Sequence, residues 1–574
     1  MQEKVVLNCL SPEGEFDIPK PLGLNPRVDS LSNKKIGLFW DGKPGGDNFF
    51  TALAELLRGM YPDASVFQVA WNDVETANKI KQYVDTFVFG VGDSGYGGYY
   101  AALQTIYLEK TGKPGVALVT DNCIHTARLS AEINGMPSLR IVSLPSLDYF
   151  PNRITVEKIK PVVEKHINKI VNALVQPLTF EEKYPKISIE KRTVQKVEIT
   201  ARDYESAFNE FNQLCIKNCW SDGLPLIPPT EKAVKEMLAG TLRHPDEIIG
   251  TLPFWNAKVT VEKIAINAVM AGAKPEYLPV IITAMECIVE DPAFDHMLSS
   301  EGSFTLAIWV NGPIAKKIGM HSGIGFLGHG WYANNTIGRA IRLCLMNIGH
   351  IRPGGFDMAL IGRPSSHTFY TFAENTDLSP WSPYHVSRGY RPEDNCVTVS
   401  TVAASFKIYG GGVVQPWDVK DVLAEIVNDI ARDRIIFSQY RLGLGSPLAH
   451  LRKHILIIHP ELAIQLQHLG YSKEKLLEYI YESTKVPYEQ LTPREIRGIQ
   501  ERLHTKPGGQ FSSIDVLPED LAQEIKDNLR PGGKIPVVHP KDIHIVVAGT
   551  IPGYSLGFTY FNRAHKTKVI MGIP

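Results

Sequence analysis

The sequence has few cysteines, no excess of charge of either sign and no long uninterrupted apolar run. Its seven cysteines are odd in number and scattered over 574 residues, which argues against a disulfide framework and favours a reducing compartment. Sixty basic residues balance 61 acidic ones, so the charge excess typical of nucleic-acid-binding proteins is missing. No uncharged apolar stretch reaches the roughly 18 residues of a membrane span, and the N-terminus lacks the basic and apolar regions of a signal peptide. We therefore expect a cytoplasmic protein that binds neither nucleic acid nor membrane.

A chain of this length exceeds one hydrophobic core, since cores stop growing near about 250–300 residues. In its first third, short apolar runs alternate with helical stretches. The runs are 34–40, 64–70, 84–92, 115–120 and 139–144, and the helical stretches are 48–60, 74–83, 98–110, 122–134 and 154–175. This alternation predicts an α/β fold with an open, flavodoxin-like parallel sheet and helices on both of its faces.

The rest of the chain predicts a larger C-terminal α/β domain at 200–574, after a polar linker at 176–199. The first α/β domain would then be 34–175, preceded by a leader at 1–33. Expected helices are 203–219, 231–238, 261–271 and 275–290, and expected strands are 304–311, 356–362, 396–402, 454–460 and 542–549. The exits of strands 356–362 and 542–549 look alike, which indicates either an internal duplication or two ordinary glycine turns.

Three loops follow strands of the first domain, at 40–48, 92–98 and 120–128. Ligands of open parallel sheets bind beyond the carboxyl ends of the strands, and glycine turns before helices suit anionic groups. The candidates here are Asp93, Ser94, Gly95, Tyr96, Asn122 and Cys123. Ser94 is placed like a nucleophile, and Cys123 would be reactive if exposed but otherwise only packing. A Walker A motif is absent, the G-x-G-x-x-G match at 90–95 is weak, and glycines that only form tight turns are the alternative.

The densest polar stretch is 310–355, a glycine-rich loop that leads into a helix capped by Asn335 or Thr336. Its substrate-binding candidates are Asn311, Ser322, Asn334, Asn335 and Arg339, the last suited to a carboxylate. His321 and His329 are acid–base candidates and possible metal ligands, although their spacing is not that of a helical metal pair. Glu374 and His385, in a later segment rich in aromatic residues, complete the acid–base candidates. Each histidine alone is more often a hydrogen-bonded structural residue than a catalyst.

Several segments carry a family resemblance. "FGVGDSGYGG" (89–98), "KPGVALVTDNC" (113–123) and "MPSLRIVSLP" (136–145) resemble the UGSC-type family, named for a Sec-Gly-Ser-Cys motif, and are distantly similar to the selenoprotein B component of glycine reductase. Segments of the second half such as "VNGPIAKKIGMHSG" (310–323) and "FAENTDLSPWSPYHV" (372–386) look like a domain associated with the same family. In this alignment Ser94 takes the selenocysteine position and Gly97 the cysteine position. The resemblance thus implies a shared ligand site without thiol redox chemistry.

These observations together predict an enzyme that cleaves a bond in a small anionic substrate, by a lyase or hydrolase reaction, in a cleft between the two domains. The alternatives are a reductase that uses Cys123 or a bound cofactor, and a non-catalytic subunit of a complex. No cofactor is clearly encoded, so its identity is left open. We expect a homo-oligomer or a complex subunit.

Overall fold

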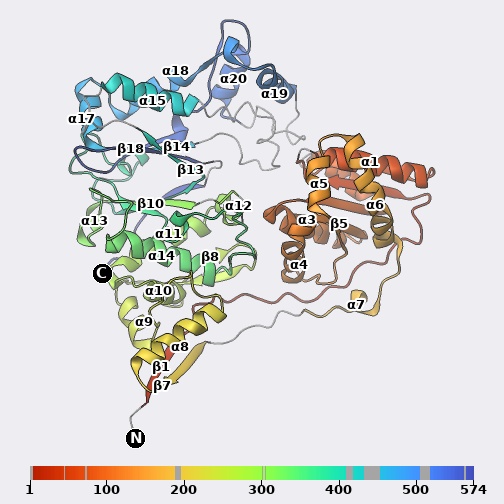
Figure 1. Ribbon diagram of the computed structural model, residues 1–574, viewed down its shortest axis with the longest axis horizontal. Coiled ribbons are helices and arrows are strands. Elements are labelled where there is room, and N and C mark those ends of the chain that lie inside the picture. The colour runs from red at the N-terminus through yellow and green to blue at the C-terminus, as the bar shows by residue number, and fades with distance from the viewer. Residues whose placement is uncertain are drawn as a thin grey trace.

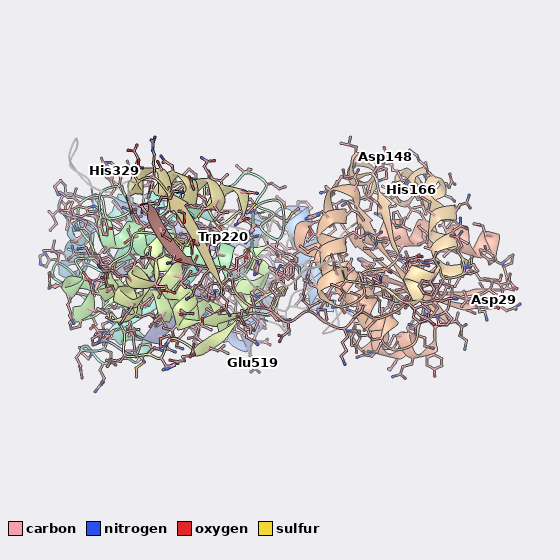
Figure 2. The ribbon with its side chains drawn as sticks, turned by 90° about the horizontal axis from the view of Figure 1, so that it is seen from below. Asp29, Asp148, His166, Trp220, His329 and Glu519 are labelled. Carbon is pink, nitrogen blue, oxygen red and sulfur yellow. The ribbon has the colours of Figure 1, made fainter. Side chains whose placement is uncertain are left out.

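Two α/β bodies lie side by side in the computed structural model, a smaller N-terminal one and a larger C-terminal one (Figure 1, Figure 2). The structure describes residues 4–43, 45–71, 74–187, 195–299, 302–303, 305–408, 418–431, 453–504, 517–560 and 564–574. Among the described residues, no helix combines the length and apolar character needed to span a bilayer.

The N-terminal body is a five-stranded parallel sheet in the order β3-β2-β4-β5-β6, with helices on both faces. Its strands are β2 (Lys35–Trp40), β3 (Ser65–Ala70), β4 (Thr86–Gly92), β5 (Gly115–Thr120) and β6 (Ile141–Leu144), and its helices are α1 (Gly46–Met60), α2 (Val74–Tyr83), α3 (Gly95–Glu109), α4 (Ile124–Ile133), α5 (Ser146–Asn152) and α6 (Val156–Val175). The order is that of a flavodoxin-like sheet, and all five predicted strands are confirmed. Strands β4 and β5 are buried along their whole length, as expected for strands covered on both faces.

The leader and the expected linker both contribute to regular structure. Strand β1 (Val5–Leu10) pairs antiparallel with β7 (Lys196–Ala201), so the end of the expected linker is a strand. Helix α7 (Phe180–Lys183) lies within the same segment. Cys9 of β1 is part of the C-terminal core, which ties the start of the chain to the second body.

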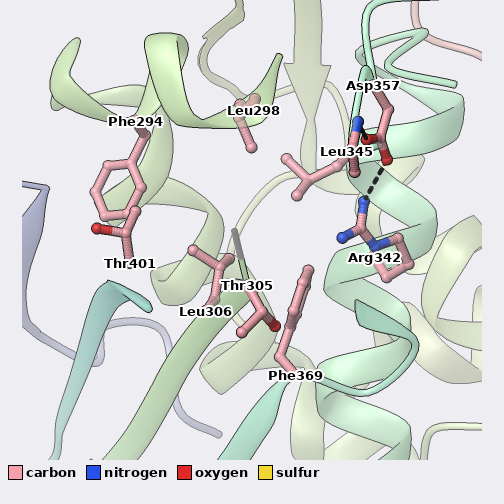
Figure 3. A pocket seen from close by; sticks show the side chains of 10 residues that line it. Phe294, Leu298, Thr305, Leu306, Arg342, Leu345, Asp357, Phe369 and Thr401 are labelled. Atoms are coloured by element: carbon pink, nitrogen blue, oxygen red, sulfur yellow. Dashed lines mark hydrogen bonds and ion pairs between the residues drawn. The ribbon is translucent and has the colours of Figure 1, made fainter. Parts of the chain in front are cut away.

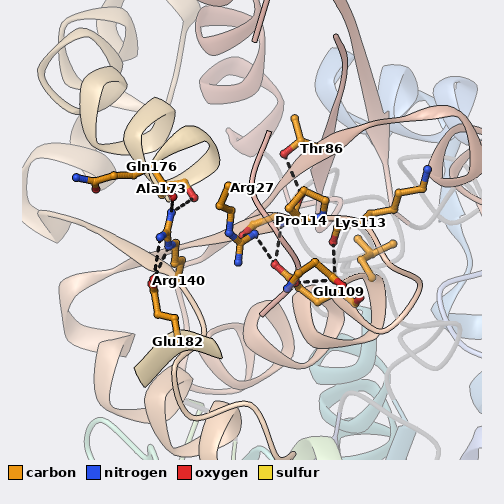
Figure 4. Close-up of polar contacts among 12 residues, drawn as sticks. Arg27, Thr86, Glu109, Lys113, Pro114, Arg140, Ala173, Gln176 and Glu182 are labelled. Carbon is orange, nitrogen blue, oxygen red and sulfur yellow. Dashed lines mark hydrogen bonds and ion pairs between the residues drawn. The ribbon is translucent and has the colours of Figure 1, made fainter. Parts of the chain in front are cut away.

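Further along the leader, a buried ion pair attaches the chain to the parallel sheet. Arg27 Nη1 donates to Glu109 Oε1 at 2.6 Å and to the Gly115 carbonyl oxygen at 3.2 Å (Figure 4). The two side chains are 1% and 0% exposed. Asn25 adds its backbone N–H and its side-chain amide to Glu109 Oε2. The leader therefore contacts both bodies.

The C-terminal body has two mixed sheets packed face to face, with helices outside each sheet (Figure 1). Its helices are α8 (Tyr204–Lys217), α9 (Glu231–Leu238), α10 (Val261–Met270), α11 (Leu278–Val289), α12 (Ala293–Leu298), α13 (Pro313–Lys317), α14 (Tyr332–Asn347), α15 (Val419–Ala431), α17 (Pro460–His468), α18 (Lys473–Thr484), α19 (Pro493–His504) and α20 (Glu519–Asn528). Its strands are β8 (Ile248–Leu252), β9 (Ala257–Thr260), β10 (Thr305–Asn311), β11 (Tyr370–Ala373), β12 (Cys396–Val402), β13 (Ala404–Ile408), β14 (Lys453–Ile458), β15 (Val486–Pro487), β16 (Lys534–Ile535), β17 (Ile543–Val547), β18 (Ser555–Tyr560) and β19 (His565–Val569). The layer between the two sheets is apolar and includes Trp309, Phe372, Ile455 and Phe558.

The two sheets repeat one pattern. Sheet β11-β10-β12-β19 has a parallel pair, β10 with β11, followed by two antiparallel pairings. Sheet β17-β14-β18-β13 has the same sequence of directions. Strand β13 follows β12 along the chain but joins the other sheet, and β19 follows β18 and joins the first. The connectivity thus supports a duplication in which the two sheets have exchanged their last strands, β13 and β19. The strand exits that look alike in the sequence do not occupy equivalent places in the two sheets.

Two local predictions are wrong. Residues 356–362 form no strand. Phe356 stacks on Phe254, Met358 lies against Gly95 of the N-terminal body, and Leu360 and Ile361 are exposed, so these apolar side chains share no sheet face. Helix α14 begins at Tyr332 and not after Asn335 or Thr336. Those two side chains act as donors to the Trp331 and Tyr332 carbonyls one turn back, so neither caps the helix.

Candidate active site at the switch point of the parallel sheet

Ser94 and Lys43 meet where the strand order of the parallel sheet reverses. The chain leaves β2 toward β3 on one side and returns to β4 on the other, and such a switch point opens a crevice at the carboxyl ends of the strands. Lys43 follows β2 and Ser94 follows β4. The Lys43 ammonium donates to Ser94 Oγ at 2.8 Å, and the Gly97 N–H donates to the same oxygen at 3.1 Å as part of the N-cap of α3.

Lys43 lies between two carboxylates. Its Nζ is 2.6 Å from Asp93 Oδ1 and 3.6 Å from Asp41 Oδ2. Arg153 Nη1 donates to the other oxygen of Asp93. Asn48 fixes this arginine by donating to its backbone carbonyl at 2.9 Å. The site thus holds two cations and two carboxylates around one hydroxyl.

Burial perturbs the acidity of Asp41. Burial raises the pKa of its carboxyl to about 7, against the opposing attraction of Lys43 and with a further rise from the Asp93 charge. Its side chain is 8% exposed. A carboxyl that titrates near neutral pH, next to a lysine that contacts a serine, is suited to accept and return a proton.

The glycines of the turn allow close packing of the protein against itself. A side chain at Gly92 would meet the Gly97 carbonyl at 2.6 Å, and one at Gly98 would meet Cys123 at 2.9 Å. These contacts let α3 start directly against β4 and the loop after β5. A side chain at Gly90 would likewise meet the Leu118 carbonyl at 2.6 Å, so close packing accounts for the first two glycines of the weak G-x-G-x-x-G match without a dinucleotide.

The remaining N-terminal candidates surround this turn. Asn122 is exposed in the loop after β5, and Tyr96 is half-buried in contact with Tyr99 and Tyr100. Cys123 is fully buried against Gly98, so the exposure that a reactive thiol requires is not met and packing accounts for it.

Gly95 is part of the contact between the two bodies. A side chain there would overlap Met358 and approach the Ser299 carbonyl at 3.3 Å. Close by, Tyr99 packs edge-on against Phe254 and Phe356 at 5.1 and 5.6 Å between ring centroids. The serine-bearing turn therefore faces the C-terminal body at residues 298–299 and 356–358.

Glu374 and Asn311 form a buried polar cluster of the C-terminal body. Glu374 Oε2 accepts from the Asn311 side chain and from the Tyr384 N–H at 2.6 Å, while Lys473 Nζ lies 3.6 Å from Oε1. The carboxylate is 0% exposed. His385 follows Tyr384 and is buried as well. These groups link β10, β11 and α18, which is a structural contribution.

His321 and Asn334 organise the glycine-rich loop before α14. Asn334 accepts from the His321 N–H at 2.8 Å and donates to the His321 and Phe326 carbonyls at 3.0 Å each. The His321 ring stacks on Trp331 at 3.4 Å, and both rings contact the Ile324 carbonyl. The polar residues of this loop therefore satisfy its own backbone groups.

The other candidates of this loop lie apart from Ser94. Asn335 donates to the Gly328 and Trp331 carbonyls, and Ser322 accepts from the Gly549 N–H through its carbonyl. His329 is exposed on the side of the C-terminal body that faces away from the N-terminal one (Figure 2). In the parts of the chain described, no three histidine, cysteine or acidic side chains gather as a metal site would require.

Arg339 is engaged by a carboxylate of the protein itself. Its Nε and Nη2 donate to Asp222 at 2.8 and 2.9 Å, and Nη2 also donates to the Pro225 carbonyl. The bidentate geometry expected for a substrate carboxylate is thus present with an internal partner.

Sequence reasoning missed Lys43, Asp41 and Arg153. The loop at 40–48 was singled out for its glycines, and its lysine and aspartate were the signal that could have identified the site. Arg153 gives no comparable signal, because α5 was not predicted.

Comparison with known proteins gives one family match. The family model described as the UGSC family matches residues 8–176, which span most of the leader and the parallel-sheet body. No curated protein and no solved structure matches the chain significantly. The expected similarity to selenoprotein B, and the family of the second half, stay predictions.

Proposed function

Because residues 8–176 match the UGSC family model and Ser94 lies within them, we propose that the protein is an enzyme that cleaves a bond in a small anionic substrate at Ser94. The observation that carries the proposal is the 2.8 Å contact between Lys43 Nζ and Ser94 Oγ at the switch point. Between the lyase and hydrolase reactions expected from the sequence, a serine contacted by a lysine favours hydrolysis.

In the proposed step, protons pass from Lys43 to Asp41 and from Ser94 to Lys43. Ser94 Oγ attacks an electrophilic carbon or phosphorus atom of the substrate while its proton passes to Lys43. Lys43 can take this proton once it has given its own to Asp41, whose pKa of about 7 makes it an acceptor near neutral pH. Return of the proton to the leaving group completes the first half, and water then releases Ser94.

Substrate binding would use the cations of the same site. The N-terminus of α3 carries partial positive charge beside Ser94. Arg153 is 31% exposed, so part of its guanidinium faces solvent while one nitrogen bonds to Asp93. An anionic group of the substrate would lie between these two.

Labelling of the full chain with a fluorophosphonate probe tests the proposal. The serine oxygen displaces fluoride from phosphorus, and the labelled peptide is mapped by mass spectrometry. We expect labelling at Ser94 that is lost in Ser94→Ala and falls at least about 100-fold in rate in Lys43→Met, in the range of general-base contributions. Ser146→Ala, at the same edge of the sheet, and Lys160→Met, whose side chain is 41% exposed, are the matched controls.

The pH dependence adds a second criterion. Labelling should rise with pH through about 7 as Asp41 ionises and then level off. A probe that leaves Ser94 unlabelled at every pH would favour the alternative of a non-catalytic subunit.

A further inference from the structure

A cavity of about 550 Å³ lies in the C-terminal body, and none of the residues that line it belongs to the Ser94 site. Its wall comes from the end of α8 and the loop after it, from α14 and from residues 352–367. Its volume falls within the range of about 300–1,000 Å³ typical of small-molecule sites. A smaller pocket adjoins it and shares Arg342, Asp357 and Ala359 (Figure 3).

Three arginines line the cavity, and their partners do not match them in charge. Arg342 Nε donates to the Ser366 carbonyl at 2.7 Å, and its Nη1 lies 3.6 Å from Asp357 Oδ2. Its side chain is only 12% exposed, and burial lowers the pKa of its guanidinium, with Asp357 and Asp222 acting in the opposite direction.

The other two arginines have partners that leave donors unused. Arg352 Nη2 donates to Glu13 at 2.7 Å, but its buried Nε has no hydrogen-bond partner among the described residues. Arg363 donates to the Ala403 carbonyl and forms no ion pair within the described part of the chain. A guanidinium has five N–H donors, so these two groups can take further acceptors.

The carboxylates in the wall do not neutralise this charge. Asp222 lines the cavity, but both of its oxygens accept from Arg339, which lies outside the wall. Asp357 and Glu13 serve Arg342 and Arg352. Counting Arg339 and Glu13, which lie outside the wall but pair with residues in it, four guanidinium groups stand against three carboxylates, which leaves one positive charge in excess.

We propose that this cavity binds a small organic anion through Arg342, Arg352 and Arg363. The anionic group is a carboxylate or a phosphate, since both match the planar fork of arginine. Ile216 and Met346 supply apolar surface in the same wall, so the ligand carries a short apolar portion beside its charged group. The proposal does not depend on the chemistry of Ser94.

Isothermal titration calorimetry of the full chain tests the site with two probes, succinate and inorganic phosphate, in a constant-ionic-strength chloride buffer. We expect the wild-type protein to bind at least one probe. Arg363→Gln should raise the Kd for that probe about tenfold or more, as the loss of a charge-assisted hydrogen bond predicts. Arg391→Gln removes the same charge from an exposed site and should leave the Kd unchanged. The probe that binds more tightly identifies the anionic group.

Two further variants keep the outcome decisive. Arg363→Lys retains the charge without the planar guanidinium and should bind the probe with intermediate affinity. If Arg363→Gln does not fold, Arg363→Lys is compared with wild type in its place. Ser94→Ala should bind as wild type, so failure of the proposed reaction leaves this result intact. Absence of heat with both probes at millimolar concentration, or equal affinity in wild type and Arg363→Gln, would overturn the proposal.

Discussion

Replacement of Asp41 by asparagine should stabilise the N-terminal body at high pH and have little effect at low pH. An aspartate in an unfolded chain has a pKa near about 3.9, whereas burial raises that of Asp41 to about 7 in the folded chain. A carboxyl with a raised pKa favours folding while it is protonated. Its stabilising contribution is complete below about pH 4 and is lost as the pH rises through about 7.

The size of the effect follows from this difference. At about 1.4 kcal/mol for each pKa unit, a rise from about 3.9 to about 7 corresponds to about 4 kcal/mol. Asparagine has no such titration, and its side-chain oxygen can still accept from the Lys43 N–H as Asp41 does at 3.2 Å. Asp41→Asn should therefore exceed wild type by up to about 4 kcal/mol at pH 8 and match it near pH 4.

Hydrogen exchange of the β2 and β4 amides, corrected for the intrinsic pH dependence of exchange, reads the free energy of opening of this body. The exposed Asp63→Asn is the matched control and should show no pH-dependent difference. If Asp41→Asn loses more stability at pH 8 than at pH 4.5, Asp41 is an ionised partner of Lys43. Its pKa would then be too low for it to accept a proton near neutral pH, which would overturn the proton relay.

Two further substitutions test the packing around the sites. Glu109→Gln should lower the free energy of unfolding of the N-terminal body by about 3–5 kcal/mol, because it leaves the buried Arg27 guanidinium uncompensated. Hydrogen exchange of the β5 amides measures this loss. The second substitution Arg27→Met should partly reverse it, and the exposed Glu181→Gln should not reproduce it. Asn334→Leu removes the side-chain amide that donates to the His321 and Phe326 carbonyls. It should lower the free energy of unfolding by about 1–3 kcal/mol. Limited proteolysis should then cleave the loop at 319–331 faster than in wild type, and an unchanged cleavage rate would contradict this account of the loop.

The parallel sheet could be predicted from the sequence, and the sheets of the C-terminal body only in part. Each β strand of the first body is a short, mainly apolar run followed by a helix, so its signal is local. Strands β11, β13, β18 and β19 were missed, since they are short and pair with segments distant in the chain. The apolar residues at 356–362 predict a strand, but Met358 packs against the N-terminal body while Leu360 and Ile361 are exposed, a difference that only the fold reveals.

The candidate site, too, could be predicted from the sequence only in part. The turn at Ser94 stood out through its glycines, but its neighbour Lys43 is 51 residues away and becomes a neighbour only through the strand order. His321, Asn334 and Asn335 were chosen because polar residues in a glycine-rich loop often bind ligands. Here the backbone of the loop itself uses those donors and acceptors, and only the fold reveals that competition.

Lys43 can contact Ser94 because residue 97 is a glycine. By the family resemblance, Gly97 takes the position of a cysteine and Ser94 that of a selenocysteine. A Cβ atom at Gly97 would lie 2.7 Å from both Lys43 Nζ and Ser94 Oγ, and Asp41 and Asp93 hold the lysine in that place. A cysteine at this position would have to displace the ammonium that now contacts the serine hydroxyl. The same small volume can therefore hold a side chain at residue 97 or the Lys43 ammonium, but not both, and this chain has the lysine.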